Sequence, residues 1–175
     1  MTTTTNSSPD ANVLLSSSCT ARASALGHGL FATRPIGRGE TLLRIEGRIQ
    51  PQPTRYSIQL DAGAHVECED GLDEHTLRER YPWRFLNHSC APNARIAGRT
   101  LVAQLAIAEG EEITFDYTTT EAEMAEPFGC RCGASECLGT IRGFAHLSDT
   151  QRHARASLLA PHLRALLARQ SSGGR

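Results

Sequence analysis

The chain has 175 residues, with 18 basic and 19 acidic side chains and a net charge of -1. A chain of this length is expected to form one domain and to bury roughly 70% of the surface it exposes when unfolded, which is enough for one enclosed site. The balanced and scattered charge lacks the basic face of a dedicated nucleic-acid binder, so we expect no direct nucleic-acid binding.

The sequence shows no membrane or export signal. No apolar run approaches the roughly 18 residues needed to span a bilayer, and the opening MTTTTNSSPD lacks the basic start and apolar stretch of a signal peptide. We therefore expect a soluble, cytoplasmic protein with no membrane partner, and the sequence indicates no oligomeric state. All 18 basic residues are arginine, so any lysine chemistry of this protein acts on another molecule.

Short strands and turns are predicted along most of the chain. Residues 1–12 and the final SSGGR are too polar to bury, so we expect both to be disordered. GLFAT and TLLRIEGRI resemble strands around the turn RPIGRG, and YSIQLDAGAHVEC resembles a hairpin that turns at residues 61–63. RTLVAQLAIAEGEEITFDY resembles two strands around a turn at residues 109–110, and DEHTLRERY carries a weak helical signal. The pattern predicts a mostly β fold.

The end of the chain is predicted to be helical. Ser148 and Gln151 have the spacing of a capping box, and leucines recur at helical spacing from Leu158 to Leu167. Pro161 should kink or divide this helix. We interpret residues 148–170 as a C-terminal helical extension that serves packing or an interface.

Six cysteines in a reducing compartment favour metal binding over disulfides. FGCRCGASECLG contains three of them, Cys130, Cys132 and Cys137, in the pattern Cys-x-Cys-x4-Cys. Three thiolates on one loop are three corners of a tetrahedron, and a structural zinc site needs four ligands. From spacing alone the fourth is Cys19, Cys68, Cys90 or a histidine, and Cys90 stands out because it too lies in a turn-forming segment.

The segment RFLNHSCAPN gathers polar side chains in the middle of the chain. Pro92 excludes an ordinary helix here. Asn87 offers hydrogen-bond donors and acceptors, which suits the ammonium and carboxylate ends of an amino acid, although an isolated Asn more often caps a local turn. His88 taken alone is more often a structural histidine than an acid or base.

Four motifs in order resemble the SET-domain protein lysine methyltransferases. They are GHGLFA, RFLNHSCAPN, GEEITFDY and the cysteine loop, which is similar to the family's post-SET zinc motif. The resemblance spans about Gly27 to His146. It implies a fold of several small curved sheets with a pseudoknot, short helices and a C-terminal helix, and a division into a SET domain at 24–120 and a post-SET segment at 121–145.

The resemblance also implies a reaction and a site. The chain would transfer methyl groups from S-adenosylmethionine to a lysine amine of a protein or peptide substrate. Tyr117 would be the catalytic tyrosine and would also contact the cofactor. The backbone of His28, Gly29 and Leu30 would embrace the cofactor. Its amino acid and adenine parts would be hydrogen-bonded by Asn87 and His88, and Arg84 would lie close by. The family's zinc ligands fall on Cys90, Cys130, Cys132 and Cys137.

An aromatic channel would bury the substrate lysine. Five of the nine aromatic residues lie in two short stretches beside the proposed site, at residues 81–85 and 115–117. We assign Tyr56, Trp83 and Phe115 to the channel, although a phenylalanine such as Phe115 fits the core equally well. In the family, a Phe two residues before the catalytic Tyr is associated with multiple methylation, so Phe115 predicts a di- or trimethylating enzyme.

The sequence departs from many eukaryotic members of the family. It lacks a cysteine-rich cluster before the SET domain, since only Cys19 and Cys68 precede RFLNHSCAPN, and so resembles compact bacterial-type members. The acidic stretch at residues 118–127 is either a solvated linker or an attraction for a basic peptide. A small-molecule amine as acceptor, or a non-catalytic zinc and peptide-binding module, remain the alternatives to a protein lysine methyltransferase.

Overall fold

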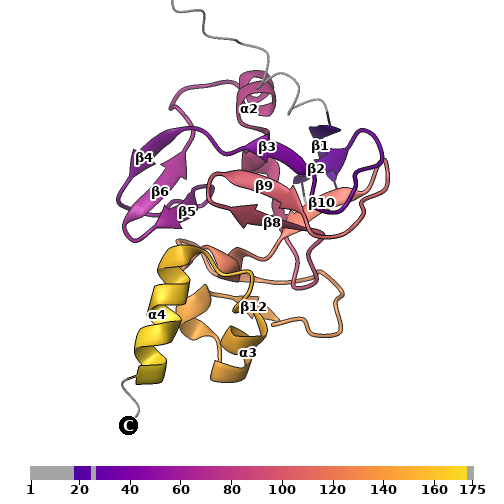
Figure 1. Ribbon diagram of the computed structural model, residues 1–175. Helices are drawn as coiled ribbons and strands as arrows, with labels where there is room; N and C mark the ends of the chain where they lie inside the picture. Colours follow the sequence, from indigo (N-terminus) through magenta and orange to yellow (C-terminus); the bar gives the residue numbers. More distant parts are fainter. Residues whose placement is uncertain (1–17, 25–26, 173–175) are drawn as a thin grey trace, which may run out of the picture.

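The computed structural model describes residues 18–24 and 27–172, so the predicted disorder of residues 1–12 lies outside the described residues. Small sheets and short helices are arranged around one main core, with the helices α3 and α4 packed at one end (Figure 1). Within the described part of the chain, no helix is both long and apolar enough to cross a membrane. The mostly β fold with a C-terminal helix is confirmed.

A four-stranded sheet carries two of the sequence motifs side by side. Its strands, in spatial order, are β1 (Cys19–Ser24), β2 (Gly27–Ala32), β10 (Glu112–Phe115) and β7 (Asn87–His88). β7 pairs in parallel with β10, which places Asn87 opposite Thr114 and His88 opposite Phe115. The polar segment and the segment that ends at Tyr117 therefore meet in one sheet, although they are about thirty residues apart in the sequence.

The structure has two further sheets, each with three antiparallel strands. One has the order β3 (Thr41–Arg44), β9 (Thr100–Ala103), β8 (Ala94–Ala97), and the other has the order β4 (Arg48–Gln50), β6 (Ala64–Glu67), β5 (Ile58–Asp61). The predicted hairpin at residues 56–68 is confirmed as β5 and β6. A small fourth sheet pairs β11 (Phe128–Gly129) with β12 (Thr140–Ile141).

The single strand predicted over TLLRIEGRI is wrong, because β3 and β4 belong to different sheets. The chain divides at Gly47, whose φ is 154°. A Cβ atom at this position would lie 2.3 Å from the carbonyl oxygen of Glu67. Only glycine allows the backbone to turn this closely against β6.

The helices follow their sequence signals. α2 (Glu74–Arg80) forms where DEHTLRERY predicts it, and Asp73 caps it by accepting a hydrogen bond from Thr76 N. The capping box of Ser148 and Gln151 is present at the start of α3 (Asp149–Ala154). Pro161 is the first residue of α4 (Pro161–Ser172), so the predicted C-terminal helix is divided into two helices there. The remaining helical turns are 3-10 turns at Pro82–Phe85, Tyr117–Thr119 and Phe144–His146.

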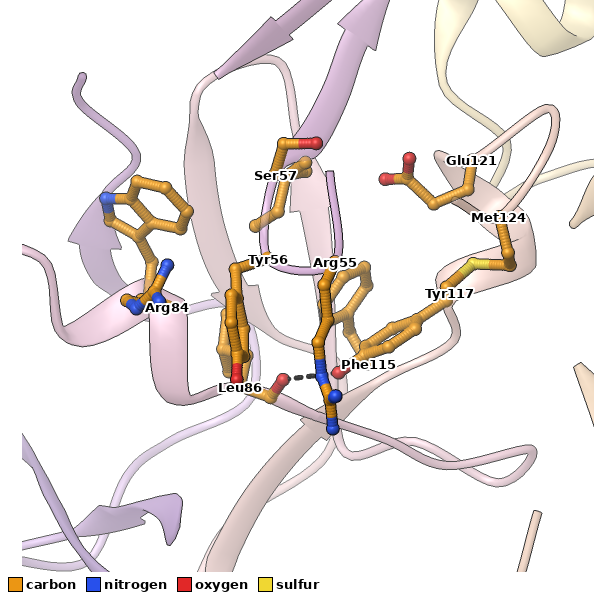
Figure 2. A pocket seen from close by; sticks show the side chains of 11 residues that line it. Arg55, Tyr56, Ser57, Arg84, Leu86, Phe115, Tyr117, Glu121 and Met124 are labelled. Atoms are coloured by element: carbon orange, nitrogen blue, oxygen red, sulfur yellow. Dashed lines mark hydrogen bonds between the residues drawn. The ribbon is translucent and has the colours of Figure 1, made fainter. Parts of the chain in front are cut away.

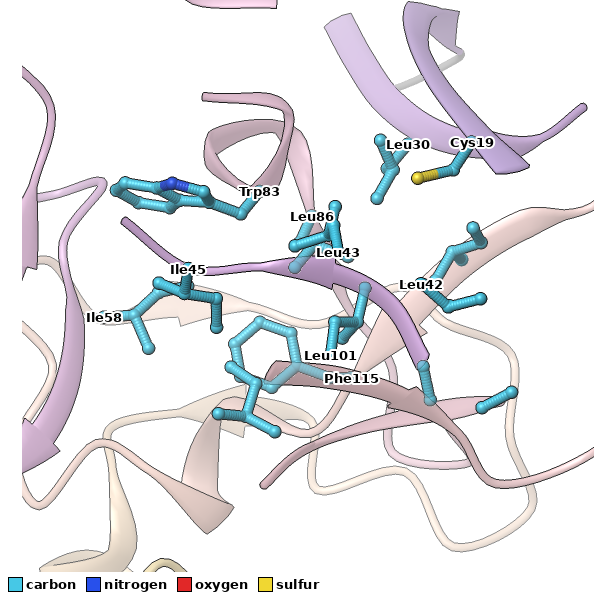
Figure 3. Close-up of a cluster of buried hydrophobic side chains, with 14 of the residues drawn as sticks. Cys19, Leu30, Leu42, Leu43, Ile45, Ile58, Trp83, Leu86, Leu101 and Phe115 are labelled. Atoms are coloured by element: carbon cyan, nitrogen blue, oxygen red, sulfur yellow. The ribbon is translucent and has the colours of Figure 1, made fainter. Parts of the chain in front are cut away.

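The main hydrophobic core lies between the sheets and includes Trp83 and Phe115 (Figure 3). Cys19 and Cys68 are buried in it, so neither is close to the cysteine loop. A second, smaller cluster of Phe144, Leu147, Leu159 and Leu163 packs the C-terminal helices together. The β sheets and the C-terminal helices thus have separate apolar cores.

Candidate active site

A narrow pocket opens beside the Tyr117 ring (Figure 2). Its walls come from the loop before β5, the 3-10 turn at Pro82–Phe85, the end of β10 and the segment after Tyr117. The lining residues are Arg55, Tyr56, Ser57, Ile58, Trp83, Arg84, Leu86, Phe115, Tyr117, Glu121 and Met124. The three residues that the sequence assigns to an aromatic channel, Tyr56, Trp83 and Phe115, are all among them.

Tyr117 is held at both ends by the polar segment. Its hydroxyl donates a hydrogen bond to the carbonyl oxygen of Leu86 at 2.6 Å, and its backbone N–H donates to His88 Nδ1 at 3.2 Å. Phe115 lies against its ring with a centroid distance of 4.8 Å. Burial raises the pKa of Tyr117 above its ordinary value of 10, so the phenol is protonated at neutral pH. Leu86 has no sequence signal, because only its backbone carbonyl takes part.

The three channel residues differ in exposure. Trp83 and Phe115 are almost fully buried, and Trp83 Nε1 donates a hydrogen bond to the carbonyl oxygen of Glu46. Both therefore belong to the core and to the pocket wall at once. Tyr56 is 45% exposed, with the Arg84 guanidinium 3.8 Å from its ring centroid and that of Arg55 at 5.5 Å. The inner wall of the pocket is thus formed by the buried rings of Trp83 and Phe115, and its exposed rim carries the guanidinium groups of Arg55 and Arg84.

A wide cleft of about 800 Å³ adjoins the narrow pocket. Both are lined by Leu86 and Tyr117, which are hydrogen-bonded to each other, so the two spaces meet around this pair. The cleft is also lined by His28, Phe85, Asn87, His88 and the loop at residues 126–132. A cleft and a pocket that meet around one tyrosine can bring two different molecules together.

Asn87 is fixed between two strands. Its amide Nδ2 donates to the carbonyl oxygen of His28 at 2.8 Å and to Glu112 Oε1 at 2.7 Å. Its Oδ1 accepts no hydrogen bond from the residues that the structure describes and is available to a donor in the cleft. Gly29 makes this arrangement fit, because a Cβ atom there would lie 2.3 Å from Glu112 Oε1.

The other predicted cofactor contacts are spread between cleft and core. His28 lines the cleft, and its Nε2 accepts a hydrogen bond from Arg78 at 2.6 Å. Arg84 lies at the boundary of cleft and pocket, 3.5 Å from Glu67 Oε1. Leu30 is fully buried in the core, and neither it nor Gly29 lines the cleft. The roles of these residues toward a cofactor stay predictions.

His88 links Tyr117 to Cys90, one of the four predicted zinc ligands. Because Nδ1 accepts from Tyr117 N–H, the neutral ring carries its proton on Nε2, which lies 3.2 Å from Cys90 Sγ. Burial lowers the pKa of His88 to about 4, although nearby Asp116 opposes the shift. The imidazole ring is therefore a neutral hydrogen-bond bridge.

Four cysteines meet at one point beside the cleft. The sulfur atoms of Cys90, Cys130, Cys132 and Cys137 lie within 4.8 Å of one another. A tetrahedral zinc ion with Zn–S bonds of about 2.3 Å places its sulfurs about 3.8 Å apart, and Cys90 Sγ and Cys130 Sγ are 4.0 Å apart. Leu138 N–H also donates to Cys90 Sγ, a contact that would stabilise a thiolate there. The residues present therefore fit a zinc ion.

Glu121 is a site residue that the sequence analysis missed. Its carboxyl lines the narrow pocket, and Oε1 accepts hydrogen bonds from Gln59 N and Thr120 Oγ1. Burial raises the pKa of Glu121 to about 7. Residues 118–121 are all buried, so the start of the acidic stretch is a pocket wall and not a solvated linker. A glutamate in a polar run has no sequence signal that marks it as buried.

Comparison with known proteins identifies the family. The SET domain model matches residues 27–118. Methyltransferase flvH of Aspergillus flavus is 31% identical over 127 residues, which are 67% of this chain and 61% of flvH. Histone-lysine N-methyltransferase ash1 of Drosophila melanogaster is 31% identical over 131 residues, which are 67% of this chain and only 6% of ash1.

Among solved structures, the methyltransferase domain of human histone-lysine N-methyltransferase SETMAR superposes with a TM-score of 0.49 at 18% identity, over 69% of this chain and 55% of that chain. The family match covers more than half of the 175 residues, and it contains the paired motifs that build the pocket at Tyr117. The chain belongs to the SET domain family.

Proposed function

We propose that this chain is an S-adenosylmethionine-dependent methyltransferase that methylates lysine side chains of a protein substrate. The observation that carries the proposal is the meeting of the narrow aromatic pocket and the wide cleft around Tyr117, whose hydroxyl is bonded to Leu86. The names of several relatives, which include histone-lysine N-methyltransferases, support the same activity.

The wide cleft suits S-adenosylmethionine. Its volume of about 800 Å³ lies within the range of about 300–1,000 Å³ that is usual for ligand sites. Asn87 presents an amide oxygen toward an ammonium group, and Phe85 and Phe128 supply aromatic surface for a base. When bound, S-adenosylmethionine supplies a methyl group on a positively charged sulfonium.

The narrow pocket suits the acceptor lysine. A free lysine has a pKa of about 10.4, so removing its proton at pH 7 costs roughly 4.6 kcal/mol. The buried walls of Trp83 and Phe115 lower that cost, because desolvation favours the neutral amine, and so does a positive charge in the adjoining cleft. The same walls exclude water and restrict the amine to one direction of approach.

Tyr117 acts in this proposal as a hydrogen-bonding and positioning group. Because its pKa is raised by burial, it does not serve as the base. The Tyr117 oxygen and the Leu86 carbonyl oxygen, linked at 2.6 Å, together line the junction through which the methyl group passes. Their fixed geometry holds the amine in line with the methyl donor.

Phe115 sets the size of the pocket in this proposal. It is 2% exposed and packs against Tyr117, and it contributes no hydroxyl that could bind a water or restrain a methylated amine. We therefore propose that the enzyme adds two or three methyl groups. Mass spectrometry of the product counts them.

The experiment uses the absence of lysine from the chain. Purified protein is incubated with radiolabelled S-adenosylmethionine and, in separate reactions, core histones and a whole-cell protein lysate. Because the chain has no lysine, every labelled lysine identified by mass spectrometry belongs to an acceptor. We expect labelled lysine in an added protein and binding of S-adenosylmethionine by calorimetry. Binding without any labelled lysine would contradict the proposed acceptor, and absence of both would contradict the enzyme.

A further inference from the structure

The segment that carries Tyr117 is hydrogen-bonded to the C-terminal helices. Asp116 is 3% exposed and caps the 3-10 turn Tyr117–Thr119: its Oδ1 accepts hydrogen bonds from Thr118 N at 3.0 Å and from Thr118 Oγ1 at 2.7 Å. Its Oδ2 accepts from Arg155 Nε at 2.7 Å. Both carboxylate oxygens are therefore occupied, and the second is occupied from outside the SET match, which ends at residue 118.

The Arg155 side chain is held by its own helix as well as by Asp116. It is the residue that ends α3, its side chain is 12% exposed, and its Nη1 donates to the carbonyl oxygen of Gln151. A guanidinium held by its own helix loses little freedom when it binds a carboxylate. The contact therefore transmits the position of α3 to the turn that begins at Tyr117.

The two residues that follow Thr118 are also held by the C-terminal segment. Ala160 N–H donates to the carbonyl oxygen of Thr119 at 2.8 Å, and buried His162 donates through Nε2 to that of Thr120 at 2.8 Å. Tyr117 itself donates hydrogen bonds to the carbonyl oxygen of Leu86 and to His88 Nδ1. The turn is thus clamped between β7 and the C-terminal helices.

We infer that Arg155 is a positioning residue for methyl transfer, which acts through Asp116 to hold Tyr117 in line with the junction of pocket and cleft. The inference rests on the proposed function. Its basis is the buried bond from Arg155 to the residue that precedes Tyr117. Because reactive geometry tolerates little displacement, loss of this bond is expected to lower the turnover rate on the order of 10²-fold.

The test compares Arg155→Met with Arg155→Lys in the 175-residue chain. The matched control is Arg152→Met, since Arg152 lies on the same helix and donates to Asp149 Oδ1 and to the carbonyl oxygen of Ala145. We expect Arg155→Met to lower the turnover rate on the acceptor that the wild type labels, without weakening the binding of S-adenosylmethionine. Arg155→Lys, which keeps a donor for Asp116, should recover part of the rate, and Arg152→Met should keep most of it.

A double-mutant cycle separates positioning from general destabilisation. In a Tyr117→Phe background, Arg155→Met should have little further effect, because the hydroxyl that it positions is gone. An equal fold-loss in both backgrounds would overturn the inference, as would an unchanged rate in Arg155→Met. If Arg155→Met does not accumulate as folded protein, Asp116→Asn combined with Arg155→Met removes the unpaired carboxylate and allows the same comparison.

Hydrogen exchange tests the contact between Arg155 and Asp116 without a measurement of methyl transfer. In Arg155→Met the amides of residues 118–120, which donate the hydrogen bonds of the turn that Asp116 caps, should exchange faster than in the wild type and in Arg152→Met. Exchange at the wild-type rate would overturn the inference even if the chain methylated nothing. A failure of the proposed function alone, by contrast, would leave this change in exchange intact.

Discussion

Glu121 introduces an ionisable carboxyl into the wall of the pocket at Tyr117. Gln59 N–H and Thr120 Oγ1 stabilise its charged form, and burial opposes it more strongly, so the pKa rises from the ordinary value of 4.5 to about 7. The folded state therefore holds a proton that the unfolded chain releases between about pH 4.5 and pH 7. Stability from this group is present at low pH and is lost as the pH rises through that window.

Glu121→Gln should remove this pH dependence. At 1.36 kcal/mol per unit, the gap between 4.5 and about 7 sets an upper bound of about 3 kcal/mol on the contribution of Glu121 to the change in unfolding free energy. Denaturant unfolding of both proteins from pH 4 to pH 8 measures it as a difference. Because His88 and His65 have lowered pKa values and oppose the trend, only the difference between the two proteins isolates Glu121.

The control for this measurement is Glu123→Gln. Glu123 is exposed and pairs with His146 at the surface, so its replacement should leave the pH dependence of unfolding close to that of the wild type. Parallel stability curves for the wild type and Glu121→Gln would show that Glu121 has an ordinary pKa and would contradict the account of its burial.

At the scale of elements, the cysteine loop and the polar segment form one unit. Cys90 lies two residues after His88, whose ring bridges Cys90 Sγ and the backbone of Tyr117. A zinc ion at the four sulfurs would therefore fix both the loop at residues 130–138 and the segment that supports Tyr117. Binding a structural zinc contributes on the order of 10 kcal/mol to such ordering.

Cys132→Ser should lose the metal and much of the stability. We expect about one zinc per wild-type chain by metal analysis and a clear fall in the unfolding temperature for Cys132→Ser, because three thiolates bind zinc far less tightly than four. Cys68→Ala is the control, since Cys68 is buried in the core and outside the cluster, and it should retain its zinc. A wild-type protein that contains no zinc by metal analysis would refute the four-cysteine site.

At the scale of the whole molecule, sequence patterns predicted what depends on local chemistry. The β5–β6 hairpin, the capping box at Ser148 and the division of the C-terminal helix at Pro161 each follow from a few adjacent residues. The meeting of the four cysteines and of Asn87 with the strand before Tyr117 is not visible in periodicity. It was expected only from the family resemblance, because motifs that occur in the family's order predict the family's strand topology.

The remaining features depend on contacts between distant segments. The split of residues 41–49 between two sheets depends on how closely Gly47 approaches Glu67, twenty residues away. Glu121 is buried because β5 lies over it, and Asp116 is paired because α3 returns to it from beyond the SET match. No local pattern in a single sequence records such pairs. The burial of Glu121 and the pairing of Asp116 with Arg155 could therefore be found only from the structure.

The central claim is that Tyr117, at the junction of pocket and cleft, enables methyl transfer to lysine. The most direct test measures single-turnover methylation of an acceptor protein by the wild type and by Tyr117→Phe, with S-adenosylmethionine binding measured on both. The account predicts that both proteins bind S-adenosylmethionine and that the rate of Tyr117→Phe is lower by about 10²- to 10³-fold, the usual loss for one positioned hydrogen-bonding group. Methylation of lysine by Tyr117→Phe at the wild-type rate would contradict it.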